Sequence, residues 1–333
     1  MNRISGLEFS RRTLDALLAA GESMGRALEC FEGSRHQDLL VKRLRQSEAI
    51  ALGAIEGERL NLNSLALDYG LSDAAVRRWP YEFGRVFAKR MPDGQPPAPA
   101  DLLAWLNETD LGPEGTTIPG YVLRLPTEWI EKRAERWQGL SSYSSGYPRL
   151  VKSADWAALW MQLSPLTRGN EVISVMIGDN ALFPRSRMSA GGLVAIGLAH
   201  ASSTWRAASF MPIADDFEDW ASARQKEEIV DRARRVWFEA VSAGCQAVIT
   251  TNNGLRKWID LLDYVCVEER KPGRFRELML KVAKAPALSA QELGRSAGIT
   301  RQAAYAALQK GRRKALLREV TGGNSFQRFA ALL

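Results

Sequence analysis

A stretch near the end of the chain decides the fold: residues 289–314 read SAQELGRSAGITRQAAYAALQKGRRK. Ser289, followed three residues later by Glu292, is a capping box, in which each side chain satisfies a backbone N–H group at the start of a helix. Gly298 predicts the end of that helix, because glycine adopts the left-handed backbone of a tight turn without a Cβ penalty. Thr300 is a suitable N-cap for a second helix. The stretch therefore predicts two short helices joined by a tight turn.

The spacing of small residues across these two helices is that of a helix-turn-helix. Gly294, Gly298 and Ala304 are small at the positions where two such helices cross closely. Ala304 and Leu308 then face the core, whereas polar side chains share the opposite face. Arginine and glutamine match the edges of guanine and adenine, and the start of the second helix enters the major groove in such modules. The predicted base-reading residues are Thr300, Arg301, Gln302, Tyr305 and Gln309.

Outward from the second helix, the sequence predicts a hairpin. The runs 316–321 and 326–329 flank a glycine-rich turn at 322–325. An amphipathic helix at 275–283 precedes the capping box, so the whole order is that of a winged helix-turn-helix. Basic side chains around these elements suit the phosphates of DNA. The predicted phosphate-binding residues are Arg295, Lys310, Arg312, Arg313, Lys314, Arg318 and Arg328.

The distribution of charge favours a polyanionic partner at this end of the chain. Residues 268–333 carry 14 lysines and arginines against five acidic residues, whereas the first 267 residues carry 31 against 33. The net charge of +7 therefore arises in the C-terminal part. A basic domain on a nearly neutral body is typical of nucleic-acid binding; the alternatives are a merely solvated basic surface or a winged helix used for protein contacts.

The hairpin and a loop in the middle of the chain resemble Fic-domain proteins. The run 317–322, LREVTG, is similar to one that precedes the second wing strand in the winged-helix tails of bacterial Fic proteins. The run 163–171, LSPLTRGNE, is similar to the Fic core motif H-P-F-x-(D/E)-G-N-G-R-x-x-R, with Pro165, Gly169 and Asn170 in agreement. The resemblance implies a mainly α fold, in which a Fic-like helical bundle carries a C-terminal winged helix-turn-helix.

The catalytic positions of that motif hold other residue types. Fic enzymes transfer a nucleotide phosphoryl group, with the histidine as general base, the acid as Mg²⁺ ligand and the arginines on the phosphates. Matched to the motif, Ser164 replaces the histidine, Arg168 the acid, and Val172 and Val175 the arginines, while Glu171 takes the third loop position. The resemblance thus implies a body without the catalytic set. A possible anion-binding loop consists of Ser164, Arg168, Gly169 and Asn170.

Residues 54–57, AIEG, resemble the inhibitory helix of Fic proteins. In that family the glutamate pairs with the second arginine of the core motif, and this position is Val175 here, so Glu56 has no evident partner. A surface or capping role in an ordinary helix is the alternative. The chain also resembles a group of rhizobial and related alphaproteobacterial helix-turn-helix proteins that share an uncharacterised N-terminal domain.

Residues 62–81 repeat the small–glycine–apolar spacing of a helix-turn-helix, with Arg77 and Arg78 as possible DNA contacts. Two residues weigh against that role. Asp73 would lie near phosphates at the helix start, and Pro80 ends the helix after two turns. The alternative is a helix pair packed against the core.

Composition argues against several classes of site. Two histidines and three cysteines without CxxC spacing argue against a histidine-rich metal site, a zinc site or a disulfide framework. The acidic run 215–219 suits the start of a helix better than a metal. We expect no metal and no cofactor. The first residues lack the apolar core of a signal peptide, and charges interrupt the most apolar stretch, 172–200, so we expect a cytoplasmic protein without membrane spans.

These observations predict four regions. They are an N-terminal helical region 1–91, a proline-rich linker 92–100, a degenerate Fic-like core 101–267 and the winged helix-turn-helix 268–333. We expect a sequence-specific DNA-binding protein that regulates transcription, whose body dimerises or binds a ligand or partner. The expected partners are double-stranded DNA and a second copy of the chain. The alternatives are a divergent Fic-type nucleotidyl transferase targeted by its winged helix, and an antitoxin-like interaction protein.

Overall fold

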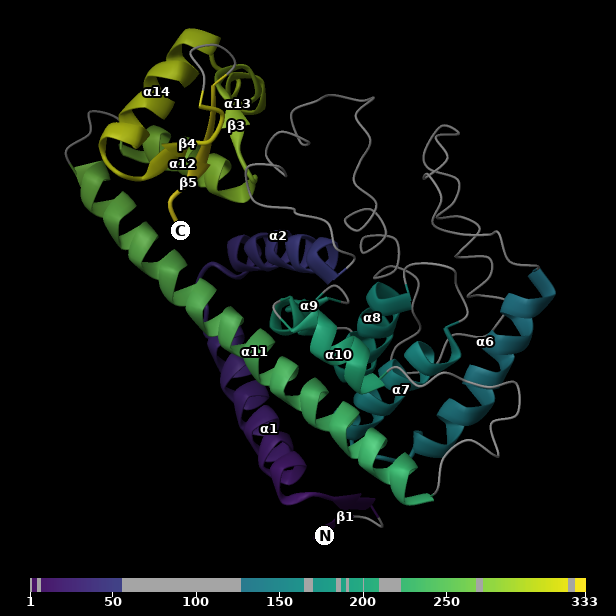
Figure 1. Ribbon diagram of the computed structural model, residues 1–333. Coiled ribbons are helices and arrows are strands. Elements are labelled where there is room, and N and C mark those ends of the chain that lie inside the picture. Colours follow the sequence, from purple (N-terminus) through teal and green to yellow (C-terminus); the bar gives the residue numbers. More distant parts are fainter. Residues whose placement is uncertain are drawn as a thin grey trace. The chain divides into compact units, whose positions relative to one another are not determined.

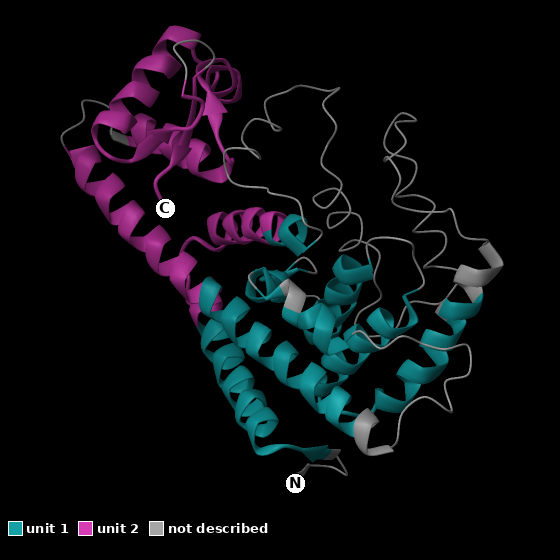
Figure 2. Ribbon diagram, in the orientation of Figure 1, with its two compact units in different colours: residues 1–29, 51–58, 79–247 teal, residues 30–50, 59–78, 248–333 magenta. Residues whose placement is uncertain are grey.

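Helices dominate the computed structural model of the chain (Figure 1), as expected for a mainly α fold. The structure describes residues 2–4, 7–55, 127–164, 170–183, 187–189, 192–199, 201–209, 223–267, 272–322 and 327–333. Several predictions lie outside these ranges, namely those for 62–81 with Arg77 and Arg78, 92–100, 215–219, Glu56, Arg168 and Gly169. The chain divides into two units (Figure 2), of which the first holds residues 1–29, 51–58 and 79–247, and the second 30–50, 59–78 and 248–333.

The chain begins with a short antiparallel hairpin that the sequence pattern did not predict, formed by β1 (Asn2–Ile4) and β2 (Leu7–Phe9). Helix α1 (Arg11–Glu32) follows directly, because the Ser10 hydroxyl accepts a hydrogen bond from the Thr13 N–H group at 3.2 Å. Helix α2 (Gln37–Ile55) comes after a short turn. The Thr13 hydroxyl also donates to the Asp231 carboxylate at 2.9 Å, which fixes the start of α1 within the first unit.

A bundle of helices forms the body of the first unit. Its members are α6 (Thr127–Ser141), the 3₁₀ turn η1 (Ser142–Ser144), α7 (Arg149–Leu163), α8 (Asn170–Leu182), α9 (Leu193–Leu198), α10 (Ser202–Ser209) and the first part of α11 (Ala223–Val267). Helices α7 and α8 pack along each other more extensively than any other pair of described elements. Both are apolar on most sides, and α8 is buried almost all round. A helix that is apolar all round belongs in a core, so this pair is the centre of the unit.

Tryptophan side chains fill much of that core. The Trp137 ring meets the rings of Trp156 and Trp160 edge to face, with centroids 6.1 and 5.8 Å apart. Its indole N–H group donates to the Trp156 carbonyl at 3.2 Å. The Trp237 indole N–H group donates to the Ser153 hydroxyl at 2.9 Å. These rings bury a large apolar area. The indole N–H groups of Trp137, Trp156 and Trp237 have a hydrogen-bond partner, whereas that of Trp160 is buried without one among the described residues.

The second unit ends in a small helical domain with a sheet. Its elements are α12 (Pro272–Lys284), β3 (Leu288–Ser289), α13 (Ala290–Ala297), α14 (Arg301–Arg313), β4 (Leu317–Glu319) and β5 (Arg328–Ala331). The sheet is antiparallel in the order β3-β5-β4, and Phe329 of β5 pairs with Leu288 on one side and Glu319 on the other. The sequence predicted a two-stranded hairpin, whereas the structure has a three-stranded sheet. This sheet is compatible with a wing. Strand β3 has only two residues, too few to show an alternating pattern.

Close packing fixes α14 within this domain. A Cβ atom on Gly311 would lie 2.7 Å from the Met279 sulfur of α12 and 2.8 Å from the Leu317 side chain of β4, so any larger residue there would force these side chains to shift. The Trp258 indole N–H group, on α11, donates to the Leu316 carbonyl at 2.9 Å. The Leu332 N–H group donates to the same carbonyl at 3.0 Å. The end of the chain and the helix before the domain thus both attach to the turn that follows α14.

The three cysteines are free thiols, and Cys245 and Cys266 are buried as expected, whereas Cys30 is half-buried. Burial and the nearby charge of Asp179 raise the pKa of the Cys245 thiol to about 12, so this thiol stays protonated near neutral pH. Within the part of the chain that the structure describes, no helix combines the length and the apolar character that crossing a bilayer requires.

Candidate nucleic-acid interface

The turn between α13 and α14 has the geometry that the sequence predicted. The Glu292 N–H group donates to the Ser289 hydroxyl at 3.3 Å, and the Glu292 carboxylate accepts from the Ser289 N–H group at 2.8 Å, which completes the capping box. Gly298 adopts φ +62°, in the left-handed region. The Thr300 hydroxyl accepts from the Ala303 N–H group at 3.2 Å and caps α14. These local bonds set the direction in which α14 leaves the turn.

The first turn of α14 presents free polar side chains. Arg301 and Gln302 are exposed, and neither side chain makes a hydrogen bond or ion pair with the part of the chain that the structure describes. Ala304 and Leu308, on the other side of the helix, are fully buried. Because the buried side anchors the helix, the guanidinium and the amide are held at a defined place on the surface and keep their donors and acceptors for a ligand.

Two other predicted base-reading residues are part of a small network. The Gln309 amide donates to the Tyr305 hydroxyl at 3.0 Å and to the Gln327 side-chain oxygen at 3.2 Å. Tyr305 is 45% exposed, whereas Gln309 is half-buried. The ring of Tyr305 therefore remains available to a ligand, while Gln309 is engaged in joining α14 to the residue before β5. Arg301 and Gln302 are not part of this network.

Most of the predicted phosphate contacts lie at the surface of this domain. Arg295, Arg313, Lys314 and Arg318 are exposed, as is Arg312, whose guanidinium lies 3.8 Å from the Glu319 carboxylate in a loose pair. The half-buried Lys310 lies over the Phe275 ring at 5.7 Å. Exposed arginines and lysines keep their charge for a polyanion, and loose surface pairs of this kind cost little to break.

Arg328 differs from the prediction. Its side chain is 10% exposed, and its guanidinium donates to the Glu292 carboxylate at 2.7 Å. Burial raises the pKa of Glu292, but the hydrogen bonds from the Ser289 backbone and from Arg328 outweigh it and lower the pKa overall. Arg328 therefore links β5 to the start of α13, so phosphate binding is not the role that its surroundings favour.

Arg43 is a charged residue beside this domain that sequence reasoning missed. It lies on α2, within the second unit, and only 7% of it is exposed. Its Nη1 atom donates to the Gln46 side chain at 3.1 Å, while Nε and Nη2 have no hydrogen-bond partner. Burial, and then repulsion from Arg318, lower the pKa of Arg43 to about 10. No local pattern could reveal this, because Arg318 lies far along the sequence.

In the first unit, the residues at the end of α7 form hydrogen bonds within the fold. Ser164 ends α7 in the left-handed region at φ 39°, and its hydroxyl donates to the Met161 carbonyl at 2.5 Å. The Arg133 guanidinium donates to the Leu163 and Ser164 carbonyls at 2.5 and 3.2 Å. The Ser164 hydroxyl thus serves the end of the helix, and the bond that it donates among the described residues is to a carbonyl rather than to a base that could activate it.

The start of α8 is likewise built into the body. Asn170 is 9% exposed, and the Glu171 carboxylate pairs with the Arg206 guanidinium of α10 at 2.7 Å. Val172 and Val175, at the positions where the resemblance places arginines, are both 0% exposed. Arginine side chains at these two positions would have to enter a packed apolar core. Of the predicted anion loop, the described residues Ser164 and Asn170 are thus in structural contacts.

A solved structure resembles the whole chain. A crystal structure of a Fic family protein from Desulfovibrio desulfuricans G20 superposes with a TM-score of 0.51 and 13% sequence identity, covering 98% of this chain and 97% of that one. The fold is Fic-like. Comparisons with protein-family models and with curated proteins give no match. The likeness is one of fold, and it agrees with the Fic-like body that the loop at 163–171 predicted.

The first unit contains, among its described residues, a buried carboxylate that the sequence did not indicate as a site residue. Asp179 of α8 is 0% exposed, and it accepts a short hydrogen bond from the Ser189 hydroxyl and another from the Val194 N–H group at 2.9 Å. The second bond comes from the first turn of α9, where a carboxylate is favoured by the free N–H groups. Asp179 therefore fixes the start of α9 against α8. A lone Asp in a run of apolar residues was the available signal.

Proposed function

We propose that this protein binds double-stranded DNA through α13, α14 and the β4–β5 wing, as a sequence-specific transcriptional regulator in the bacterial cytoplasm. The observation that carries the proposal is the first turn of α14. There, Arg301 and Gln302 are exposed and without a partner among the described residues, while basic side chains gather at the other end of the same helix. Free bidentate donors at a helix start and cations near its end suit base edges and phosphates respectively.

The proposed mode of binding places α14 in the major groove. Arg301 would donate to the O6 and N7 atoms of a guanine, and Gln302 would pair with an adenine, with Tyr305 beside them. Arg312, Arg313 and Lys314 would neutralise phosphates next to the groove. A homodimer would read a palindromic site, because each copy offers one reading helix.

In this proposal the Fic-like body is not a transferase. The support comes from residues already in structural use: Ser164 bonds to the Met161 carbonyl, and Val172 and Val175 are buried. A body of this kind serves dimerisation, a ligand or a partner.

The experiment that tests DNA binding is selection of duplexes from a random pool at about 50 and 200 mM salt, two conditions that separate specific from purely electrostatic binding. The wild-type chain should enrich a defined site, with two-fold symmetry if the protein is a dimer. Arg301→Ala should lose that enrichment, whereas Arg256→Ala, an exposed arginine on α11 in the same unit, should keep it. Binding without enrichment by the wild type would reject sequence-specific recognition.

A second candidate rests on the likeness to a Fic family protein over 98% of the chain. It is a divergent Fic-type nucleotidyl transferase that uses the loop between α7 and α8. Incubation with labelled ATP and Mg²⁺ tests it, since a transferase would label itself or a partner protein. Labelling that Asn170→Ala abolishes, with folding retained, would favour this candidate over the regulator.

A further inference from the structure

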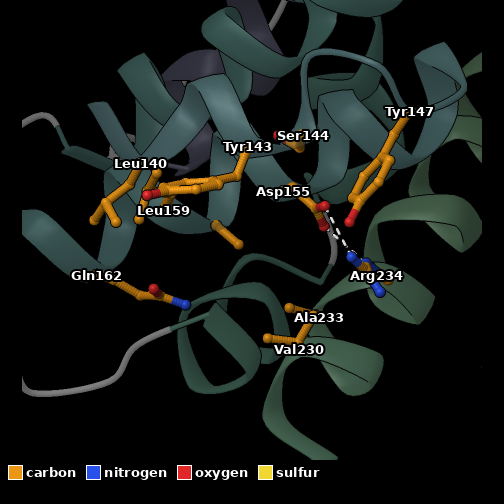
Figure 3. Close-up of a pocket in the computed structure, with 11 residues that line it drawn as sticks. Leu140, Tyr143, Ser144, Tyr147, Asp155, Leu159, Gln162, Val230, Ala233 and Arg234 are labelled. Atoms are coloured by element: carbon orange, nitrogen blue, oxygen red, sulfur yellow. Dashed lines mark hydrogen bonds and ion pairs between the residues drawn. The ribbon is translucent and has the colours of Figure 1, made fainter. Parts of the chain in front are cut away.

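A cavity of about 300 Å³ opens in the first unit, between the end of α6, η1, α7 and α11. Residues on α7 and α11 that face each other across it are far apart in sequence, for example Leu159 and Val230 (Figure 3). Its volume is at the lower end of the range for sites that hold small molecules. None of its lining residues belongs to the loop 164–170 or to α14, so it is separate from the features considered above.

The walls of the cavity are mostly apolar and aromatic. Leu140, Leu159, Val230 and Ala233 contribute aliphatic surface, and Tyr143 and Tyr147 contribute rings. Tyr143 is 81% exposed, which is unusual for a ring of this size. In Figure 3 the two tyrosines lie on the opposite side of the space from Val230 and Ala233. Aromatic rings facing aliphatic side chains across a gap form a slot that suits a flat, apolar molecule.

The Gln162 amide is a polar group of this slot without a hydrogen-bond partner among the described residues. Gln162 is 9% exposed, and its amide makes no hydrogen bond within the part of the chain that the structure describes. Figure 3 shows this amide directed into the space between Leu159 and Ala233. The amide is not among the described side-chain atoms that are shut off from solvent without a partner, so it faces the open cavity and can bond to a molecule that enters it. A ligand with a hydroxyl or carbonyl group would satisfy it.

The charges at the other end of the cavity cancel. The Arg234 guanidinium donates from Nε and Nη2 to the two Asp155 carboxylate oxygens, at 2.7 and 2.8 Å (Figure 3). Both side chains are largely buried, with 11% and 18% exposed. Since a bidentate pair of this kind leaves neither charge in want of a partner, the cavity offers no net charge to a ligand. A charged ligand would lose its hydration here without compensation.

We propose that this cavity is a binding site for a small, uncharged, ring-containing molecule that carries one hydroxyl or carbonyl group. The ring lies between the tyrosines and the α11 side chains, and its polar group bonds to the Gln162 amide. The inference concerns the first unit and holds whether or not the protein binds DNA.

The first test uses N-phenyl-1-naphthylamine, an uncharged probe whose fluorescence rises in apolar sites, titrated into the full-length chain. Saturable binding is expected. Ala233→Phe fills the cavity and should weaken binding about tenfold or more, since it removes most of the space for the ring. Ala207→Phe, at an exposed position on α10, is the matched control and should bind like the wild type. Circular dichroism and thermal melting establish that each variant is folded.

The second test replaces the Gln162 amide with an apolar side chain of comparable size. Naphthalene and 2-naphthol, which differ by one hydroxyl group, compete with the probe on the wild type and on Gln162→Leu. The variant should bind 2-naphthol about five- to tenfold more weakly, the usual effect of one lost hydrogen bond, and should bind naphthalene as the wild type does. Failure of the wild type to bind the probe saturably, equal binding by a folded Ala233→Phe, or an unchanged preference for 2-naphthol in Gln162→Leu would overturn the proposal.

Discussion

Two helix starts in this molecule, those of α8 and α14, use their polar residues in opposite ways. At α8, Glu171 pairs with Arg206, and the valines at 172 and 175 are buried. At α14, the Thr300 side chain caps the start of the helix. Arg301 and Gln302 have no partner among the described residues. The fold around α8 is Fic-like, but the side chains at the start of α8 are buried or paired within the body. A fold therefore indicates where a site could lie, while the free side chains indicate whether one is there.

The largest expected effect comes from placing an arginine in the body at a position where the Fic core motif has one. Val175→Arg should lower the free energy of unfolding by about 3–5 kcal/mol, because the new charge enters an apolar core without a partner. Chemical denaturation measures this. Val267→Arg, at a position that is 84% exposed, is the control and should change stability by about 0.5 kcal/mol or less. A stable Val175→Arg protein that transfers label from ATP would remove the contrast between the two helix starts.

The next effect concerns the framework that holds α13 and β5 together. Glu292→Gln should cost about 2–3 kcal/mol near neutral pH, because the amide cannot form the ion pair with Arg328 or the charged half of the capping box. Glu277→Gln, an exposed residue with loose pairs at 3.8 and 3.9 Å, is the control and should cost little.

The same variant has a definite pH dependence. The pKa of Glu292 in the folded chain lies below its ordinary value of 4.5, so its contribution is fully present above that value. It is lost as the pH falls through the folded pKa. The difference in unfolding free energy between wild type and Glu292→Gln should thus be constant above pH 4.5 and shrink below it. A difference that grows on acidification would contradict the assigned ion pair.

A smaller change in the opposite direction is expected at Arg43. Arg43→Met should raise the free energy of unfolding by about 1–3 kcal/mol, because a buried and under-paired charge is replaced by an apolar chain of similar length. The pKa of Arg43, lowered to about 10, agrees with this direction. It means that the folded state disfavours the charged guanidinium at every pH below that value. Lys42→Met, an exposed neighbour, is the control. A loss of stability in Arg43→Met would mean that the bond from Nη1 to Gln46 outweighs the burial of the unpartnered Nε and Nη2 atoms.

The smallest effect separates phosphate contacts from base contacts. Arg313→Ala should weaken binding to every duplex by a similar factor and reduce the dependence of log affinity on log salt by about one unit. Titration of the same duplex at several salt concentrations measures it, with Arg256→Ala as control. A change that is confined to one sequence would place Arg313 on a base instead.

The sequence was most informative where structure is set by neighbours in the chain. The capping box at Ser289, the turn at Gly298 and the cap at Thr300 are local, and each has the predicted geometry. Strand β3 was missed because its pairing with β5 joins Leu288 to Phe329 and Ser289 to Arg328, 41 and 39 positions away. Arg328 was taken for a surface residue, since its partner Glu292 is 36 positions away.

The rest of the molecule depends on tertiary contacts that no local pattern contains. The Asp155–Arg234 pair joins residues 79 positions apart, and the cavity beside it forms only when α7 and α11 pack. The Fic-like body itself was inferred from short resemblances at 54–57, 163–171 and 317–322, and the likeness of fold extends over 98% of the chain. A family resemblance could predict this much, whereas periodicity could predict only helices.

The most direct test of the central claim is the affinity of the full-length protein for its selected duplex and for a scrambled duplex of the same composition, at one salt concentration. The account predicts a preference of about 10³-fold or more for the selected duplex. It further predicts that Arg301→Ala loses about 10- to 100-fold of this preference while its affinity for the scrambled duplex is unchanged. Equal affinity of the wild type for both duplexes would contradict the claim that α14 reads DNA sequence.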